Sequence, residues 1–74
     1  MKIVSIINKN TKDEVCNQYK DKSVDLDKSI FTIGFPLRVV YESGSYFTHE
    51  IVREVKSNYD EIIITTTKKI WIIK

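Results

Sequence analysis

Residues 36–74 read PLRVVYESGSYFTHEIVREVKSNYDEIIITTTKKIWIIK, and this stretch decides the fold. It is rich in Ile, Val, Thr, Tyr and Phe, whose β-branched or aromatic side chains suit a pleated sheet better than a helix. Alternate residues of a strand point to opposite faces, so Leu37, Val39 and Tyr41 share one face of the first strand. We predict four consecutive strands in this half of the chain.

Polar turn signals separate these strands. The first is Ser43-Gly44-Ser45, where the glycine can take the positive φ of a tight hairpin loop. The next two are SNYD at residues 57–60 and TKK at residues 67–69. Pro36 lacks an amide donor and therefore fits the first residue of its strand. We expect a β-meander over residues 30–74.

One segment of this meander also fits a helix. Ile51, Val55 and Tyr59 follow helical spacing, and Thr48 stands where an N-cap would be. The β-branched residues in the same segment favour a strand. A short helix over residues 48–57 is kept as the alternative.

The first part of the chain predicts a hairpin over residues 1–20, because a cluster of turn-forming residues separates two apolar segments. A capping-box pattern from Thr11 to Glu14 instead opens a short helix over residues 11–20. Residues 20–29 alternate acidic and basic side chains and read as an exposed connection. We expect this connection to enter the core at Val24 and Leu26.

A chain of 74 residues forms a single domain, spanning residues 1–74. The turn signals divide it into six or seven short strands, among them residues 14–19 and 29–33, with at most one short helix. The predicted fold is all-β, either a small antiparallel barrel or an open, strongly twisted meander.

The strand Ile70–Ile73 is apolar on both faces and needs cover on both sides. We therefore expect either an N-terminal element or a second subunit over it, with a homo-oligomer formed through residues 70–74 as one outcome. The apolar run Ile3–Ile7 is too short for a signal-peptide core or a membrane span. We expect a cytoplasmic protein without membrane contact.

The chain is poor in groups that perform chemistry. Cys16 and His49 are the only cysteine and histidine, whereas a structural zinc site needs about four ligands. In a regular strand, Thr48 and Glu50 would point away from the face of His49, which leaves the imidazole without a catalytic partner. No glycine-rich phosphate loop is present, because only two glycines occur. We expect a protein that is not an enzyme and needs no metal or cofactor.

Nucleic-acid binding is the second class considered, because small β-barrels bind single strands with aromatic platforms and lysines. The candidate lysines are Lys56, Lys68 and Lys69. The formal net charge is only +2, and acidic residues are spread through the same segments. A dedicated binder usually has a clustered basic stripe, so this class ranks second.

The run PLRVVYESG, the Tyr46-Phe47-Thr48 segment and the closing TTKKIWII together resemble small phage and mobile-element proteins of low-GC Gram-positive bacteria. The resemblance covers about half of the chain and assigns no functional residue. It implies an accessory protein that acts by binding, and many such proteins block a host defence nuclease such as a CRISPR effector.

The function expected from the sequence is therefore a non-enzymatic protein-binding module, with a phage-encoded inhibitor of a larger host defence protein as its specific form. A small nucleic-acid-binding barrel and a structural subunit of a phage particle are the alternatives. Tyrosine and arginine supply much of the energy at protein interfaces. The candidate contact residues are Arg38, Tyr41, Tyr46, Phe47, Arg53 and Tyr59.

Overall fold

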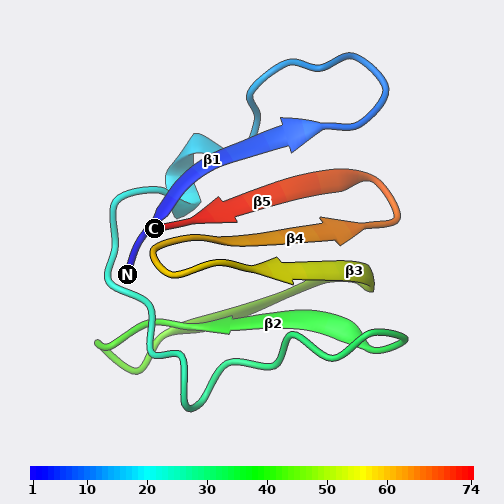
Figure 1. Ribbon diagram of the computed structural model, residues 1–74. Coiled ribbons are helices and arrows are strands. Elements are labelled where there is room, and N and C mark those ends of the chain that lie inside the picture. The colour runs from blue at the N-terminus through cyan, green and yellow to red at the C-terminus, as the bar shows by residue number, and fades with distance from the viewer.

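The computed structural model describes all residues from 1 to 74. Five antiparallel strands form one sheet in the order β1-β5-β4-β3-β2 (Figure 1). The strands are β1 (Ile3–Asn8), β2 (Pro36–Val40), β3 (Tyr46–Ser57), β4 (Ile62–Thr66) and β5 (Lys69–Ile73), and a single 3-10 turn, η1, covers Asn17–Tyr19. The all-β prediction is confirmed.

Strands β2 to β5 form the expected meander, each strand pairing with the next in the chain. Leu37 and Val39 are fully buried on one face of β2, as their alternation predicts. In the first turn, Gly44 has a φ of +97°, and its N–H donates to the carbonyl of Tyr41 at 2.9 Å. The alternative helix over residues 48–57 does not form, because β3 occupies this segment.

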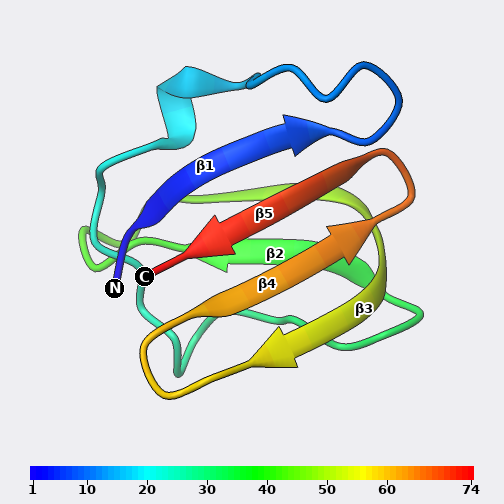
Figure 2. The ribbon, with the colours of Figure 1, turned by 45° about the horizontal axis from the view of Figure 1, so that its top comes forward.

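The long strand β3 bends the sheet. Its first half pairs with β2 and its second half with β4. From Thr48 to Ile51 it advances three residues while its partner strand advances two, from Arg38 to Pro36. A second irregularity lies between Val52 and Glu54. Bulges of this kind increase bending and twist, and β2 consequently lies behind β4 and β5 in Figure 2.

The strands do not close into a barrel, so the open alternative of the prediction is the observed one. Residues 21–25 span the opening at one end. On one side the N–H of Val24 donates to the carbonyl of Met1 at 2.7 Å, and on the other the N–H of Asp25 donates to the carbonyl of Val40 at 2.8 Å. This segment therefore links the start of β1 to the end of β2.

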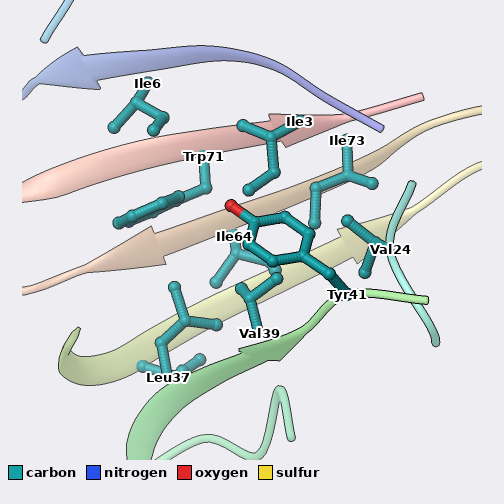
Figure 3. Close-up of a cluster of buried hydrophobic side chains, with 10 residues drawn as sticks. Ile3, Ile6, Val24, Leu37, Val39, Tyr41, Ile64, Trp71 and Ile73 are labelled. Carbon is teal, nitrogen blue, oxygen red and sulfur yellow. The ribbon is translucent and has the colours of Figure 1, made fainter. Parts of the chain in front are cut away.

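The core fills the space between β2 and the other strands (Figure 3). Trp71 on β5 lies at its centre and is fully buried. The buried hydrophobic residues are Ile3, Ile6, Val24, Leu37, Val39, Tyr41, Val52, Ile64, Trp71 and Ile73. Because every strand contributes, no single element of this chain buries its apolar face alone.

Two predicted strands are reduced to single bridges, which is why five strands form and not six or seven. Within residues 14–19 only Glu14 pairs with β1, and within residues 29–33 only Ile30 pairs with β2. Cys16 has a φ of +56°, which turns the chain away from β1 and into η1. The connection enters the core at Val24, as expected, but the prediction for Leu26 is wrong, since it is 40% exposed.

Candidate functional site

An arginine stacked on an exposed tyrosine marks the outer face of the β2–β3 hairpin. The guanidinium carbon of Arg38 lies 4.5 Å from the centre of the Tyr46 ring, and Tyr46 is 61% exposed. The two side chains share a face because Tyr46 pairs with Val40, two residues along β2 from Arg38. The contact orients both side chains, so a partner would have to immobilise less of them on binding.

Three further apolar side chains are exposed in the segment that leads into β2. Ile30 exchanges backbone hydrogen bonds of 2.8 and 3.1 Å with Arg38 and is 41% exposed, while Ile33 and Phe35 are each 60% exposed. Their chain segment is held in place, because the N–H of Phe35 donates to the carbonyl of Thr32 at 3.1 Å. We call the set Ile30, Ile33, Phe35, Arg38 and Tyr46 the β2 surface.

Two of the predicted contact residues face the core. Tyr41 is only 5% exposed, and its hydroxyl donates to the carbonyl of Tyr19 at 2.9 Å. Burial, together with the nearby Tyr19, raises the pKa of Tyr41 to about 12. Phe47 is half-buried and stacks against Trp71, with ring centres 5.5 Å apart. These two rings support the hairpin from inside and do not form part of its outer surface.

The remaining predicted contact residues lie apart from the Arg38–Tyr46 pair. Tyr59 is fully exposed in the turn between β3 and β4, beyond the end of β3 that is opposite Tyr46. Arg53 is exposed beside Val52, whose N–H donates to the carbonyl of Phe35 at 2.9 Å. Arg53 thus lies at the margin of the β2 surface, whereas Tyr59 lies outside it.

The three candidate lysines for nucleic acid are not brought together. Lys56 pairs with Ile63 near the start of β4, whereas Lys68 lies in the turn after β4. Lys69 is tied to Glu50 by an ion pair of 3.0 Å, and its side chain is only 15% exposed. The structure therefore gives no continuous basic groove to a phosphate backbone through these residues.

A polar cluster lies where the first bulge of β3 meets β4 and β5. Nδ1 of His49 is 2.7 Å from Oε2 of Glu50, and Nζ of Lys69 donates to the same carboxylate at 3.0 Å. The hydroxyl of Thr66 donates to Oε1 of Glu50 at 3.0 Å. The predicted placement of His49 and Glu50 on opposite faces is wrong, because the extra residue of the bulge interrupts the alternation.

This cluster stabilises the ionised form of Glu50. Burial alone would raise the pKa of Glu50, but hydrogen bonds from His49, Lys69 and Thr66 outweigh it and lower the pKa from 4.5 to about 2. A carboxylate with so low a pKa is a weak base near neutral pH. The geometry thus suits a clamp between β3, β4 and β5 better than proton transfer.

Aromatic rings enclose the imidazole of His49 on its other sides. The ring centres of Trp71, Tyr19 and Phe47 lie 4.9, 5.4 and 5.5 Å from that of His49, each at a steep angle. Such edge contacts are favourable and fix the ring. The imidazole of His49 therefore occupies the space between these three aromatic rings.

One open hollow of about 400 Å³ lies beside the β2–β3 turn. It is lined by Lys22, Ser23, Tyr41, Glu42 and Ser43. The ammonium of Lys22 lies 5.4 Å from the centre of the Tyr41 ring. Four of the five lining residues are polar or charged, and no group of three potential metal-ligating side chains occurs anywhere in the chain.

The apolar part of the β2 surface was not predicted from the sequence. Ile30 and Ile33 were predicted in a short strand, and Phe35 was given no role, although the run IFTIGF has four large apolar side chains around a glycine. Their exposure became apparent only with the turn at Thr32–Phe35.

The structure also contains no helix that has both the length and the apolar character needed to cross a membrane.

No protein-family model matches this sequence, and neither a curated protein nor a solved structure shows significant similarity to it.

Proposed function

We propose that this protein is a non-enzymatic binding module that presents the β2 surface to a larger protein. The observation that carries the proposal is the Arg38–Tyr46 stack, together with the exposed Ile30, Ile33 and Phe35 in the segment that leads into β2. Large apolar side chains at about 60% exposure are costly to leave in water. Exposed apolar side chains on the same hairpin as an arginine–tyrosine pair are typical of a protein-contact surface.

The β2 surface contains the residue types that are typical of protein interfaces. Tyrosine and arginine are enriched among the residues that contribute most binding energy, and apolar neighbours exclude water around them. The backbone bonds that hold Ile30 and Phe35 keep the surface ordered before binding. An ordered surface loses less entropy on association.

The resemblance of the sequence to phage accessory proteins extends the proposal to a specific partner. In this form the protein is a phage-encoded inhibitor that acts in the host cytoplasm on a defence protein, such as a CRISPR nuclease. The mixed surface charge, with a net charge of +2, suits a protein partner better than a polyanion.

The proposal is tested by affinity capture from a lysate of a low-GC Gram-positive host, with and without nuclease treatment. The bait proteins are the wild type, Arg38→Ala, Tyr46→Ala and Phe35→Ala. We expect one larger protein to be retained by the wild type after nuclease treatment and to be lost from each of the three variants. Far-UV circular dichroism checks that each variant remains folded.

Tyr59→Ala is the matched control, because Tyr59 is at least as exposed as Tyr46 and lies outside the β2 surface. This variant should retain the partner. Equal loss with Tyr59→Ala, or retention by all three test variants, would show that another surface binds. Recovery of nucleic acid alone, with affinity falling steeply between about 50 and 200 mM salt, would favour the nucleic-acid alternative.

A further inference from the structure

The face of the sheet opposite the core carries a block of isoleucines. Ile7 on β1 pairs with Ile70 on β5, and Ile72 on β5 pairs with Ile63 on β4. Alternation directs these side chains away from buried Trp71, and all four remain partly exposed. Figure 2 is seen from this side, with β1, β5 and β4 in front of β2. We call Ile7, Ile63, Ile70 and Ile72 the isoleucine face.

Two residues of opposite charge border this face on β3. Glu54 pairs with Thr65, which in turn pairs with Ile70, and Lys56 pairs with Ile63. Nζ of Lys56 and Oε1 of Glu54 are 3.6 Å apart, and the two side chains are 68% and 58% exposed. The outer face therefore carries two neighbouring rows of residues that run across the strands. One row consists of Ile7, Ile70, Thr65 and Glu54 and ends in a carboxylate, and the next consists of Ile72, Ile63 and Lys56 and ends in an ammonium.

The edges of the sheet are covered by other segments of the chain. Along β1, the N–H of Val15 donates to the carbonyl of Ile6 at 2.8 Å, and along β2 the N–H of Ile30 donates to the carbonyl of Arg38 at 2.8 Å. Strand β5 lies between β1 and β4. Association through the C-terminal strand is therefore open only through its outer face.

The order of the rows fits a second copy of the same chain. Consider a two-fold axis that runs across the strands, midway between the rows and midway between two stacked sheets. This axis places Ile70 over Ile72 of the second copy and Glu54 over Lys56 of the second copy. By symmetry, Ile72 then lies over Ile70 of the second copy, and Lys56 lies over Glu54 of the second copy. An isologous interface requires this self-complementarity, and a net charge of only +2 gives little repulsion between copies.

We propose that the protein forms a symmetric homodimer by stacking its isoleucine faces, with two reciprocal Glu54–Lys56 contacts along one border. Stacked sheets lie about 10 Å apart and within about 30° of parallel. Four strands about 4.8 Å apart make a contact face only about 15 Å across. An interface of this size is at the low end for specific complexes, so the dimer should be weak and its population should depend on protein concentration. The dimer leaves the β2 surface free and is independent of the function proposed above.

The test is sedimentation velocity on the full chain between about 10 µM and 1 mM. The wild type should shift from the monomer to the dimer mass with increasing concentration. Ile72→Thr keeps a β-branched residue but adds a hydroxyl to the contact, and it should raise the dissociation constant at least tenfold.

Variants that reverse the charges of Glu54 and Lys56 distinguish this dimer from other ways of covering the isoleucine face. Glu54→Lys and Lys56→Glu should each weaken dimerisation at least threefold, because each places like charges opposite one another. The double variant Glu54→Lys/Lys56→Glu should restore the wild-type constant within about twofold. Asp60→Lys, in the exposed turn after β3, is the control and should leave the constant unchanged.

The proposal is overturned if the wild type remains monomeric at 1 mM, or if it forms species larger than a dimer. It is also overturned if the double variant is as weak as the single variants, since the symmetry then differs. Circular dichroism on each variant confirms folding, and Ile72→Thr provides a readout that does not depend on charge.

Discussion

Nδ1 of His49 lies 2.7 Å from Oε2 of Glu50, although the two residues are neighbours on a strand. A regular strand would direct their side chains to opposite faces. The bulge of β3 opposite β2 removes this alternation and brings both to the same cluster. The same irregularity that bends the sheet therefore also creates its most strongly perturbed carboxylate.

The Glu50 cluster predicts acid-dependent stability. A pKa of about 2 in the folded chain, against 4.5 without these contacts, means that ionised Glu50 stabilises the fold above pH 4.5. This contribution is lost as the pH falls from 4.5 to 2. Glu50→Gln should lower the free energy of unfolding by about 2 kcal/mol at pH 7 and by little at pH 2. Thermal unfolding at a series of pH values measures both.

Glu54→Gln, measured at concentrations where the protein is monomeric, is the matched control for this variant, because Glu54 is also on β3 but its side chain is 58% exposed in the monomer. Its removal should change the free energy of unfolding by less than about 0.5 kcal/mol at any pH. Equal effects of the two substitutions would contradict the clamp role of the Glu50 cluster.

Tyr41 predicts the alkaline limit of stability. Burial raises its pKa to about 12, whereas an exposed tyrosine titrates near pH 10. The neutral hydroxyl thus stabilises the fold below pH 10, and this contribution is lost as the pH rises from 10 to 12. Tyr41→Phe should cost about 1 kcal/mol at pH 7, through loss of the bond to the carbonyl of Tyr19. Its stability should then fall less steeply above pH 10 in urea unfolding.

Backbone conformation predicts opposite effects at two turns. Gly44 has a φ of +97°, and an added Cβ would meet no atom within 4 Å. Gly44→Ala should therefore destabilise by about 1–2 kcal/mol through backbone strain alone. Lys12 is exposed and has a φ of +67°, so Lys12→Gly should be neutral or stabilising by up to about 1 kcal/mol. A urea midpoint that falls in both variants, Gly44→Ala and Lys12→Gly, would contradict this prediction.

Trp71 tests the packing of the core. Its side chain is fully buried, and its Nε1 has no hydrogen-bond partner. Trp71→Ala should cost about 3–5 kcal/mol through lost contacts and a cavity. Trp71→Phe should cost only about 1–2 kcal/mol, because it keeps a ring and removes an unsatisfied donor. Equal losses from the two Trp71 variants would contradict this account of the core.

The sequence predicted the meander well, because alternation and turn chemistry are local. Leu37 and Val39 were placed correctly on the buried face, and Gly44 was placed correctly in a positive-φ turn. The prediction failed at the β-bulge, where one strand has an extra residue relative to its partner and the side chains beyond it change face. The bulge at His49 and Glu50 depends on the register of β3 against β2, and register is a property of the pair and not of either segment.

The candidate surface was predictable only in part. Arg38 and Tyr46 follow from residue type and strand position, and the structure places them in contact. Tyr41 and Phe47 have the same residue character but point inward, since alternation around the hairpin puts them on the core side. Phe35 became part of the surface through a turn that leaves it 60% exposed, and no periodicity marks such a turn.

The pairing of β1 with β5, in which Ile3 lies opposite Ile73, ties folding to the timing of protein synthesis. Strand β1 leaves the ribosome before the other strands of this sheet, and its partner β5 is the last of them to be made. At about 5–20 residues per second, β1 waits several seconds or more with Ile3 and Ile6 unprotected. The hairpins of β2 to β4 can form during this interval, because their contacts are local. The sheet can therefore be completed only after β5 emerges, and the nascent sheet is most prone to misassociation just before that.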